Sequence, residues 1–205
     1  MNTPELLQKY DEKQRLFEDL KRAGEAYLGR NLKKQNFKYE LSSRIKEFDS
    51  FSEKALRKKM SNPFDEMVDI VGLRVICLFQ SDVDRAKEVI RETFQVVKED
   101  NKITKIPTDV FNYAETHFDV RLRNLPDDKL ALDEKRKFEI LSRMVFEIQV
   151  RTICQHAWSS ISHNMFHKNK GPVPKNIERD FYAINGMFYI ADTHFEMIKG
   201  ISSTE

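Results

Sequence analysis

One seven-residue stretch, 146–152 (FEIQVRT), constrains the fold of this chain more than any other. Apolar and polar side chains alternate along it: Phe146, Ile148 and Val150 on one side, Glu147, Gln149 and Arg151 on the other. Because successive side chains of a strand point to opposite faces, the stretch predicts a half-buried strand. Its polar face presents an acid, an amide and a guanidinium about 7 Å apart. Such a row can bind a metal ion, a base edge and a phosphate; the simpler interpretation is an exposed sheet face.

The composition is that of a globular protein with one core. The chain has 205 residues, 40% of them hydrophobic and 33% charged, so we predict a single domain over residues 1–205. Within it we expect an N-terminal helical segment (1–36), a catalytic core (37–170) and a C-terminal helix (171–205). Cys77 and Cys154 lie among apolar residues, which favours reduced core thiols over a disulfide. A polar N-terminus and the lack of a long apolar run predict a cytoplasmic protein without a membrane contact.

Hydrophobic periodicity predicts an α/β (α+β) protein with a mixed β-sheet flanked by helices. We expect strands over 37–46, 70–79, 95–98, 117–123 and 144–151, helices over 50–60, 83–94 and 152–167, and long helices at both ends, over 3–29 and from Pro174 onward. A charged loop is expected over 126–137.

The last predicted helix carries a long apolar stripe. Its members are four and three residues apart: Ile177, Phe181, Ile184, Phe188, Ala191, Phe195 and Ile198. A stripe of this length needs a partner, which is either the N-terminal helix of the same chain or another subunit.

Basic residues are concentrated in one part of a chain whose net charge is only +2. Ten lysines and arginines fall between Arg30 and Lys59. Most such runs are solvated helix faces, but a basic half that faces an acidic metal site is also what a polyphosphate ligand requires.

Four local patterns together resemble the synthetase domain of RelA/SpoT-type alarmone enzymes in its small single-domain form. The matching segments are 43–46 (SRIK) with the Asp49 to Lys58 region, 69–75 (DIVGLRV), Tyr113 with His117, and 147–152 (EIQVRT) leading into Trp158 and His163. They span about two-thirds of the chain in the family's order. The resemblance implies a nucleotidyltransferase-like synthetase fold and transfer of pyrophosphate from ATP to the 3'-hydroxyl of GDP or GTP, which gives ppGpp or pppGpp.

The resemblance assigns Asp69 and Glu147 as the catalytic acids and the ligands of Mg²⁺. The chemistry agrees, because attack on a phosphate builds charge on phosphate oxygens, and carboxylates hold the Mg²⁺ that bridges them. Asp69 stands just before its strand, and Gly72 allows the backbone to bulge or to approach a neighbour closely.

Six residues match the ATP contacts of the family. Arg44 and Arg74 match the arginines that sandwich adenine, a use for a flat cation that lysine cannot copy. The triphosphate contacts are matched by Lys46, Ser50, Lys54 and Arg57. Three of these share one helix face at spacings of four and three, with Ser50 near the helix N-terminus, where phosphate binds favourably.

The acceptor side matches less closely. The resemblance assigns acceptor nucleotide binding to Tyr113, His117, Gln149, Arg151 and His156. Residues 112–117 read NYAETH, which departs from the family's usual Gly-Tyr-(Arg or Gln)-Ser-x-His. A carboxylate at Glu115 would repel an incoming phosphate by about 4 kcal/mol at ~4 Å in an effective dielectric near ~20, unless it points away or pairs with an arginine.

Three functions remain open on the sequence. The first is a synthetase that uses ATP and GDP or GTP. The second is a toxin-type relative that pyrophosphorylates tRNA 3' ends or adenine nucleotides and is paired with an antitoxin. The third is a non-catalytic nucleotide-sensing regulatory module. Relatives of this size also suggest a homo-oligomer, a dimer or a tetramer, built through the terminal helices.

Overall fold

A five-stranded sheet forms the centre of the protein in the computed structural model, which describes residues 3–101, 115–123, 132–167 and 174–202. The strands are β1 (Tyr39–Ile45), β2 (Val71–Cys77), β3 (Phe94–Asn101), β4 (Thr116–Leu122) and β5 (Phe146–Thr152). Their order across the sheet is β1-β2-β5-β4-β3. β2 and β5 are parallel and the other neighbours antiparallel, so the sheet is mixed as predicted.

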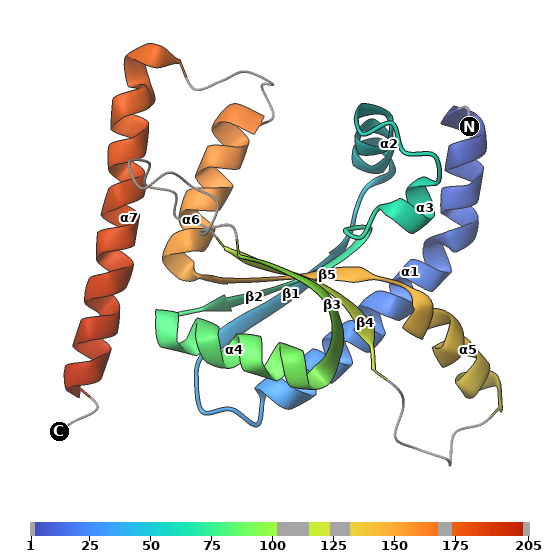
Figure 1. The fold of residues 1–205 in the computed structure, drawn as a ribbon, viewed down its shortest axis with the longest axis horizontal. Helices are drawn as coiled ribbons and strands as arrows, with labels where there is room; N and C mark the ends of the chain where they lie inside the picture. Colours follow the sequence, from blue (N-terminus) through green and yellow to red (C-terminus); the bar gives the residue numbers. More distant parts are fainter. Residues whose placement is uncertain (1–2, 102–114, 124–131, 168–173, 203–205) are drawn as a thin grey trace.

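Two helices cover the apolar face of the sheet (Figure 1). They are α1 (Thr3–Leu32) and α4 (Gln80–Thr93). The buried stripe of α1 packs into a core that includes Leu73, Phe118, Phe146 and Ile148. Gly24 permits this close packing, because a Cβ atom there would lie 3.2 Å from the Phe146 ring.

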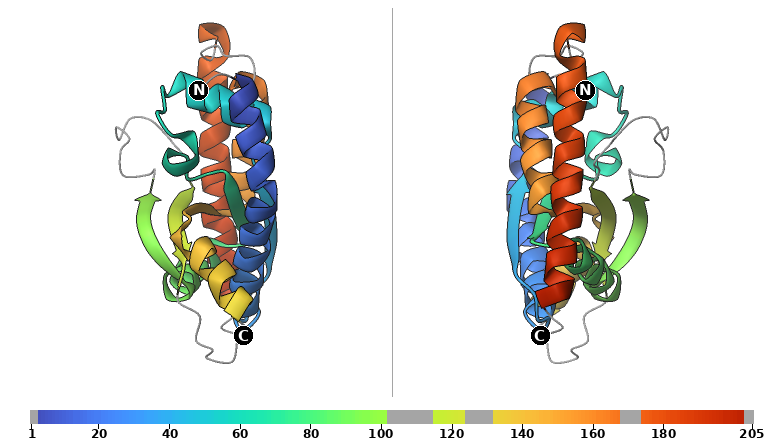
Figure 2. Two further views of the ribbon diagram at one scale, coloured as in Figure 1. Left: turned by 90° about the vertical axis from the view of Figure 1, so that its right-hand side faces the viewer. Right: turned by 90° about the vertical axis from the view of Figure 1, so that its left-hand side faces the viewer.

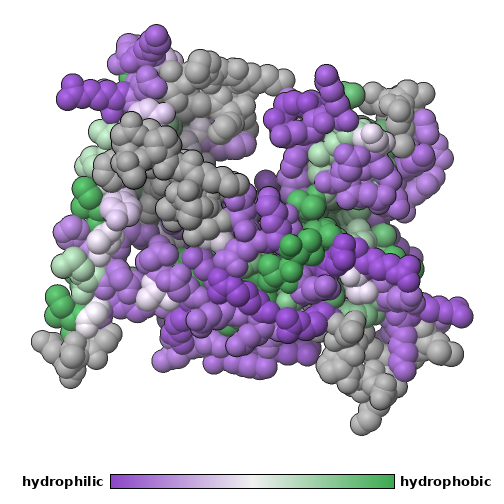
Figure 3. Space-filling view, in the orientation of Figure 1, coloured by the Kyte–Doolittle hydropathy of each residue, from purple (hydrophilic) through white to green (hydrophobic). Residues whose placement is uncertain are grey.

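The opposite, polar face of the sheet is flanked at its two ends (Figures 1 and 2). One end carries α2 (Phe48–Arg57) and α3 (Pro63–Glu66), and the other carries α6 (Ile153–Ser162) with α7 (Lys175–Ser202) outside it. Thr152 caps α6 in a reciprocal capping box with Gln155, which fixes how the helix leaves β5. Between the two ends the molecular outline is notched, with mostly hydrophilic residues at the base of the notch (Figure 3).

One predicted loop is wrong, and one predicted helix is present but changes form before its end. The predicted charged loop over 126–137 overlaps a helix, α5 (Leu132–Arg143), whose Leu141 is buried. Its many charged residues suggested a loop, but Glu, Lys and Arg are also strong helix formers. The predicted helix over 152–167 ends as α6 at Ser162 and continues as a π-helical turn, η2 (His163–His167).

The stripe of the C-terminal helix does not use the N-terminal helix as its partner. α7 packs against α6 and α4. The Trp158 ring lies 4.4 Å from the Phe181 ring and 6.2 Å from the Phe188 ring, measured between centroids. The rest of the stripe differs, since Ile184, Phe195 and Ile198 are about half exposed.

Both cysteines, Cys77 and Cys154, are free and buried, as predicted. Among the helices of the described ranges, none combines the length and apolarity that crossing a membrane requires.

Candidate active site

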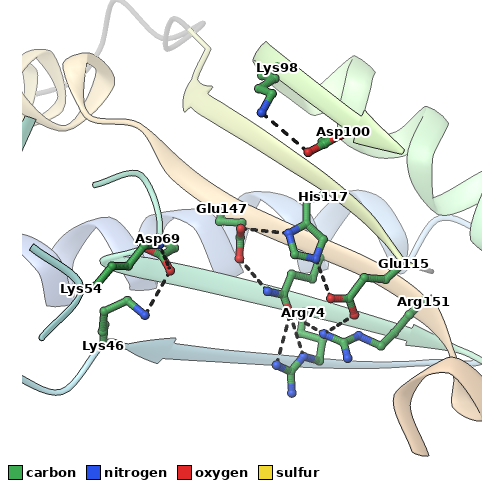
Figure 4. A network of polar contacts seen from close by, with 11 residues as sticks. Lys46, Lys54, Asp69, Arg74, Lys98, Asp100, Glu115, His117, Glu147 and Arg151 are labelled. Carbon is green, nitrogen blue, oxygen red and sulfur yellow. Dashed lines mark hydrogen bonds and ion pairs between the residues drawn. The ribbon is translucent and has the colours of Figure 1, made fainter. Parts of the chain in front are cut away.

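The polar face of the sheet gathers six of the thirteen predicted site residues into three rows that run across the strands. From the strand register these rows are Arg44, Gly72, Glu147 and Asp119; then Ser42, Arg74, Gln149 and His117; then Glu40, Ile76 and Arg151. The strand pairing, rather than any one motif, therefore brings segments 100 residues apart in sequence together. Figure 4 shows the polar contacts that join them.

A cleft of about 200 Å³ opens on the side of this face nearest β1 and β2. It is lined by Ser42, Ser43, Arg44, Asp69, Gly72, Leu73, Arg74, Glu147 and Gln149. Gly72 stands between Arg44 and Glu147, and a Cβ atom at that position would meet nothing within 4 Å. The strand is regular there, so no backbone bulge is needed. The missing side chain instead leaves open space beside the Glu147 carboxylate.

Asp69 reaches this cleft from the turn that precedes β2. Its Oδ2 atom is 3.0 Å from Lys46 Nζ and 2.8 Å from Lys54 Nζ. Its Oδ1 atom is buried and accepts no hydrogen bond within the described structure. Asp69 therefore positions two predicted triphosphate ligands and keeps one oxygen available, and a second carboxylate, Glu147, lines the same cleft.

The two arginines predicted to hold adenine both line the cleft, from β1 and β2. Arg74 donates to Gln149 Oε1 from Nε at 3.3 Å and from the second guanidinium nitrogen at 3.2 Å. Burial, and then the charge of Arg44, lower the pKa of Arg74. Two guanidinium groups held this close repel one another, so an anionic or electron-rich ligand between them is favoured.

None of the four predicted triphosphate residues is among the residues that line the cleft, and two of them have no contact with Asp69 in the described structure. Ser50 and Arg57 are exposed on α2, with Lys54 half-buried on the same helix. The structure thus brings Lys46 and Lys54 to Asp69 but leaves Ser50 and Arg57 on the helix surface.

A chain of polar contacts extends from Glu147 toward the β5–α6 junction (Figure 4). His117 Nδ1 lies 3.0 Å from Glu147 Oε1, and His117 Nε2 lies 2.6 Å from Glu115 Oε1. Gln149 donates to Glu147 Oε2 at 2.6 Å. Burial lowers the pKa of His117, but the hydrogen bonds and charges of Glu115 and Glu147 outweigh it, and the pKa is raised. Both ring nitrogens face carboxylates, an arrangement that favours the imidazolium form.

Arg151 is the last residue of this chain of contacts. Its guanidinium is 2.7 Å from Glu115 Oε2, and only 3% of the side chain is exposed. Of the two outcomes considered for Glu115, pairing with an arginine is confirmed. Burial lowers the pKa of Arg151 to about 10.

His156, the remaining predicted acceptor residue, is half-buried on α6. Its pKa is lowered by burial first and then by the positive charges of Arg151 and Arg74. Its Nδ1 atom is buried without a hydrogen-bond partner in the described structure. Tyr113 lies outside the described residues.

Sequence reasoning overlooked two residues of this face, Ser42 and Asp119, and one cleft residue from the other face, Ser43. Ser42 and Ser43 line the cleft, and Asp119 stands opposite Glu147 on β4. Burial and the Glu147 charge raise the pKa of Asp119. The alternation of polar residues at 117, 119 and 121 was the available signal for Asp119, and its register with Glu147 was not readable from the sequence.

The chain is similar to two curated proteins of Bacillus subtilis (strain 168), the GTP pyrophosphokinases YjbM and YwaC. Identity is 29% over 143 residues to YjbM and 30% over 142 residues to YwaC. These matches cover 67% and 66% of this chain and 61% of each relative, so the match spans less than two-thirds of either relative's length.

The fold is also that of a solved structure. The crystal structure of the small alarmone synthetase 1 from Bacillus subtilis superposes with a TM-score of 0.72 at 22% identity, over 97% of this chain and all of that chain. A family model described as the region found in RelA / SpoT proteins matches residues 43–172, which include every site residue predicted from the sequence. The chain therefore belongs to the RelA/SpoT family.

Proposed function

We propose that this protein transfers the pyrophosphoryl group of ATP to the 3'-hydroxyl of GDP or GTP and so makes the alarmones ppGpp or pppGpp. The observation that carries the proposal is the cleft in which Arg44 and Arg74 stand beside the carboxylates of Asp69 and Glu147. Family membership and the relatives named GTP pyrophosphokinases support it.

In the proposed reaction the acceptor's 3'-oxygen bonds to the β-phosphorus of ATP, and the bond from that phosphorus to the α–β bridging oxygen breaks. AMP leaves, and the 3'-hydroxyl proton passes to the Glu147 carboxylate. Arg44 and Arg74 hold the adenine between them, while Lys46 and Lys54 bind the phosphates. We assign the acceptor to the His117, Gln149 and Arg151 side of the cleft.

Asp69 and Glu147 would also hold Mg²⁺. The fit rests on their hard oxygen ligands, on the Oδ1 atom of Asp69 that lacks a partner, and on the open space in front of Gly72. When bound, Mg²⁺ neutralises charge that develops on the phosphate oxygens.

We also infer that a second copy of this chain covers the outer side of α7. Large apolar side chains are exposed there: Met187, Ile190, Met197, Ile198 and Ile201. Several large apolar side chains exposed together on one helix are characteristic of a protein–protein interface.

The test is to incubate β-labelled ATP with GDP, GTP, GMP, ATP and deacylated tRNA in parallel and to resolve the products. Label on GDP or GTP, with one AMP per transfer, is the expected result. Label on tRNA or on an adenine nucleotide would instead identify the toxin-type activity, and no transfer to any acceptor would identify a regulatory module. The Glu147→Gln variant is the matched control for contaminating activity.

A further inference from the structure

Glu115 occupies a position that calls for an explanation, because an acid there competes with the phosphates that an acceptor nucleotide carries. Its two carboxylate oxygens engage two different cations, His117 at 2.6 Å and Arg151 at 2.7 Å. Both cations are among the residues predicted to bind the acceptor. The carboxylate therefore takes the place that an anionic group of a ligand would otherwise take on both of them.

We propose that Glu115 is a specificity residue of the acceptor subsite. By holding Arg151 and His117 in ion pairs, it favours guanine nucleotides with fewer phosphates. This inference rests on the proposed function and adds to it which acceptors are preferred.

The charge balance around the network is the first support. Two cations, Arg151 and His117, face two carboxylates, Glu115 and Glu147. Arg74 also acts on this network through its charge, and the network carries one positive charge more without Glu115. Each additional phosphate on an acceptor gains more from the more cationic subsite.

Burial is the second support. Only 3% of the Arg151 side chain and 15% of the Glu115 side chain are exposed, so water screens this ion pair weakly. An acceptor phosphate that reached Arg151 would have to displace Glu115 and leave its carboxylate buried beside the incoming charge. Acceptors that do not need this contact avoid that penalty.

The donor side of the cleft shows that the arrangement is local. There Lys46 and Lys54 pair with Asp69, and Arg44 and Arg74 line the cleft with Asp69 and Glu147. Glu115 makes its direct ion pairs with acceptor-side cations and acts on Arg74 only through its charge, so its removal should change ATP binding less than acceptor binding.

The experiment measures dissociation constants of GMP, GDP and GTP by calorimetry, with Mg²⁺ and a saturating non-hydrolysable ATP analogue. The wild-type protein should show no gain in affinity from GMP to GTP. Glu115→Gln keeps the size of the side chain and removes its charge, and it should raise the ratio of the GMP constant to the GTP constant at least about tenfold. The affinity for the ATP analogue should change less than the affinity for GTP, because Glu115 acts on Arg74 through its charge alone.

Two further variants serve as controls for the charge removed in Glu115→Gln. Glu40→Gln is the matched control, because it removes a carboxylate from the same sheet face that has no contact with Arg151 or His117 in the described structure. Glu115→Asp keeps the charge and should keep the wild-type ratio; it also provides a folded variant if Glu115→Gln is unstable. A ratio that stays within about twofold in Glu115→Gln, or that rises equally in Glu40→Gln, overturns the inference.

Labelled transfer assays on the same proteins separate this inference from the proposed function. If the ratio shifts as expected but the wild-type protein labels no guanine nucleotide, the proposed function fails and the role of Glu115 stands. If transfer occurs and the ratio does not shift, the role of Glu115 alone fails. If no guanine nucleotide binds or reacts, both are overturned.

Discussion

The two sides of the polar sheet face differ in how their charges are balanced. On the donor side the cations outnumber the acids, since Lys46 and Lys54 pair with Asp69, and Arg44 and Arg74 line the cleft with Asp69 and Glu147. On the acceptor side Arg151 and His117 are each matched by a carboxylate. Under the proposed function, this difference suits a polyphosphate at the donor end and less charged ligands at the acceptor end.

The largest expected effect is that of replacing Glu147, which lies between the donor and acceptor sides. Glu147 bonds to His117 and Gln149 and stands opposite Asp119. Glu147→Gln should lower kcat by about 10³ or more, because the proton acceptor and a charge at the reacting centre are lost. The thermal midpoint should stay the same or rise, since the repulsion between Glu147 and Asp119 is relieved.

Steady-state kinetics and a thermal melt check this prediction together. Glu139→Gln, on the exposed Arg143 pair of α5, is the control and should behave like the wild type. An unfolded Glu147→Gln protein, or one with normal turnover in Mg²⁺, would show that the acid is structural.

The next largest effect concerns the helix behind the acceptor side. Phe188 packs on Trp158 of α6, the helix that carries His156. Phe188→Glu should lower the free energy of unfolding by about 3 kcal/mol, because a charge would be placed against an apolar partner. Where the protein stays folded, the KM for the acceptor should rise more than the KM for ATP.

A variant on the outer side of the same helix separates packing from assembly. Ile190 is 53% exposed, so Ile190→Glu should keep stability and give a smaller species by light scattering. An unchanged mass for Ile190→Glu would contradict a role of α7 in assembly, and unchanged stability for Phe188→Glu would contradict its role in packing against α6.

A smaller effect should be confined to the donor side. Arg44→Lys keeps the charge but loses the flat guanidinium that stacks on adenine, so the KM for ATP should rise about tenfold while the KM for GDP stays constant. Initial rates with each substrate varied in turn give both constants. Equal changes in the KM for ATP and the KM for GDP would mean that Arg44 does not act on ATP binding alone.

The smallest expected effect is a pH dependence of the acceptor side. The pKa of His117 is raised above its ordinary value of 6.5, so its contribution to stability is fully present below that pH and is lost as pH rises through the folded-state value. Thermal midpoints without added Mg²⁺ should therefore fall more between pH 6.5 and more alkaline conditions in the wild type than in His117→Asn. Parallel curves would show that the imidazolium does not contribute.

The sequence predicted which residues share the polar face better than it predicted how they pair, for a physical reason. Arg44, Asp69, Arg74 and Glu147 lie on or beside strands whose alternation fixes the direction of their side chains. The pairing of Glu115 with Arg151 depends on how β4 aligns with β5, and local periodicity contains no information about register. Sequence reasoning could therefore name the competing acid but not its partner.

The helices likewise separate into features that local periodicity predicts and features that depend on tertiary packing. α1 and α4 were predicted because each has a clear apolar stripe that packs on the sheet. α5 was missed because its charged residues hide a short stripe of Phe138 and Leu141. Of the two partners predicted for α7, the N-terminal helix was wrong, because a stripe indicates that a surface is buried and not which element covers it.

A crystal structure with a non-hydrolysable ATP analogue, GDP and Mg²⁺ tests the division of the cleft most directly. The account predicts adenine between Arg44 and Arg74, the triphosphate toward Lys46 and Lys54, and GDP beside His117 and Gln149 with the Glu115–Arg151 pair intact. An ATP analogue bound at Arg151, or GDP phosphates that separate Glu115 from Arg151, would contradict it.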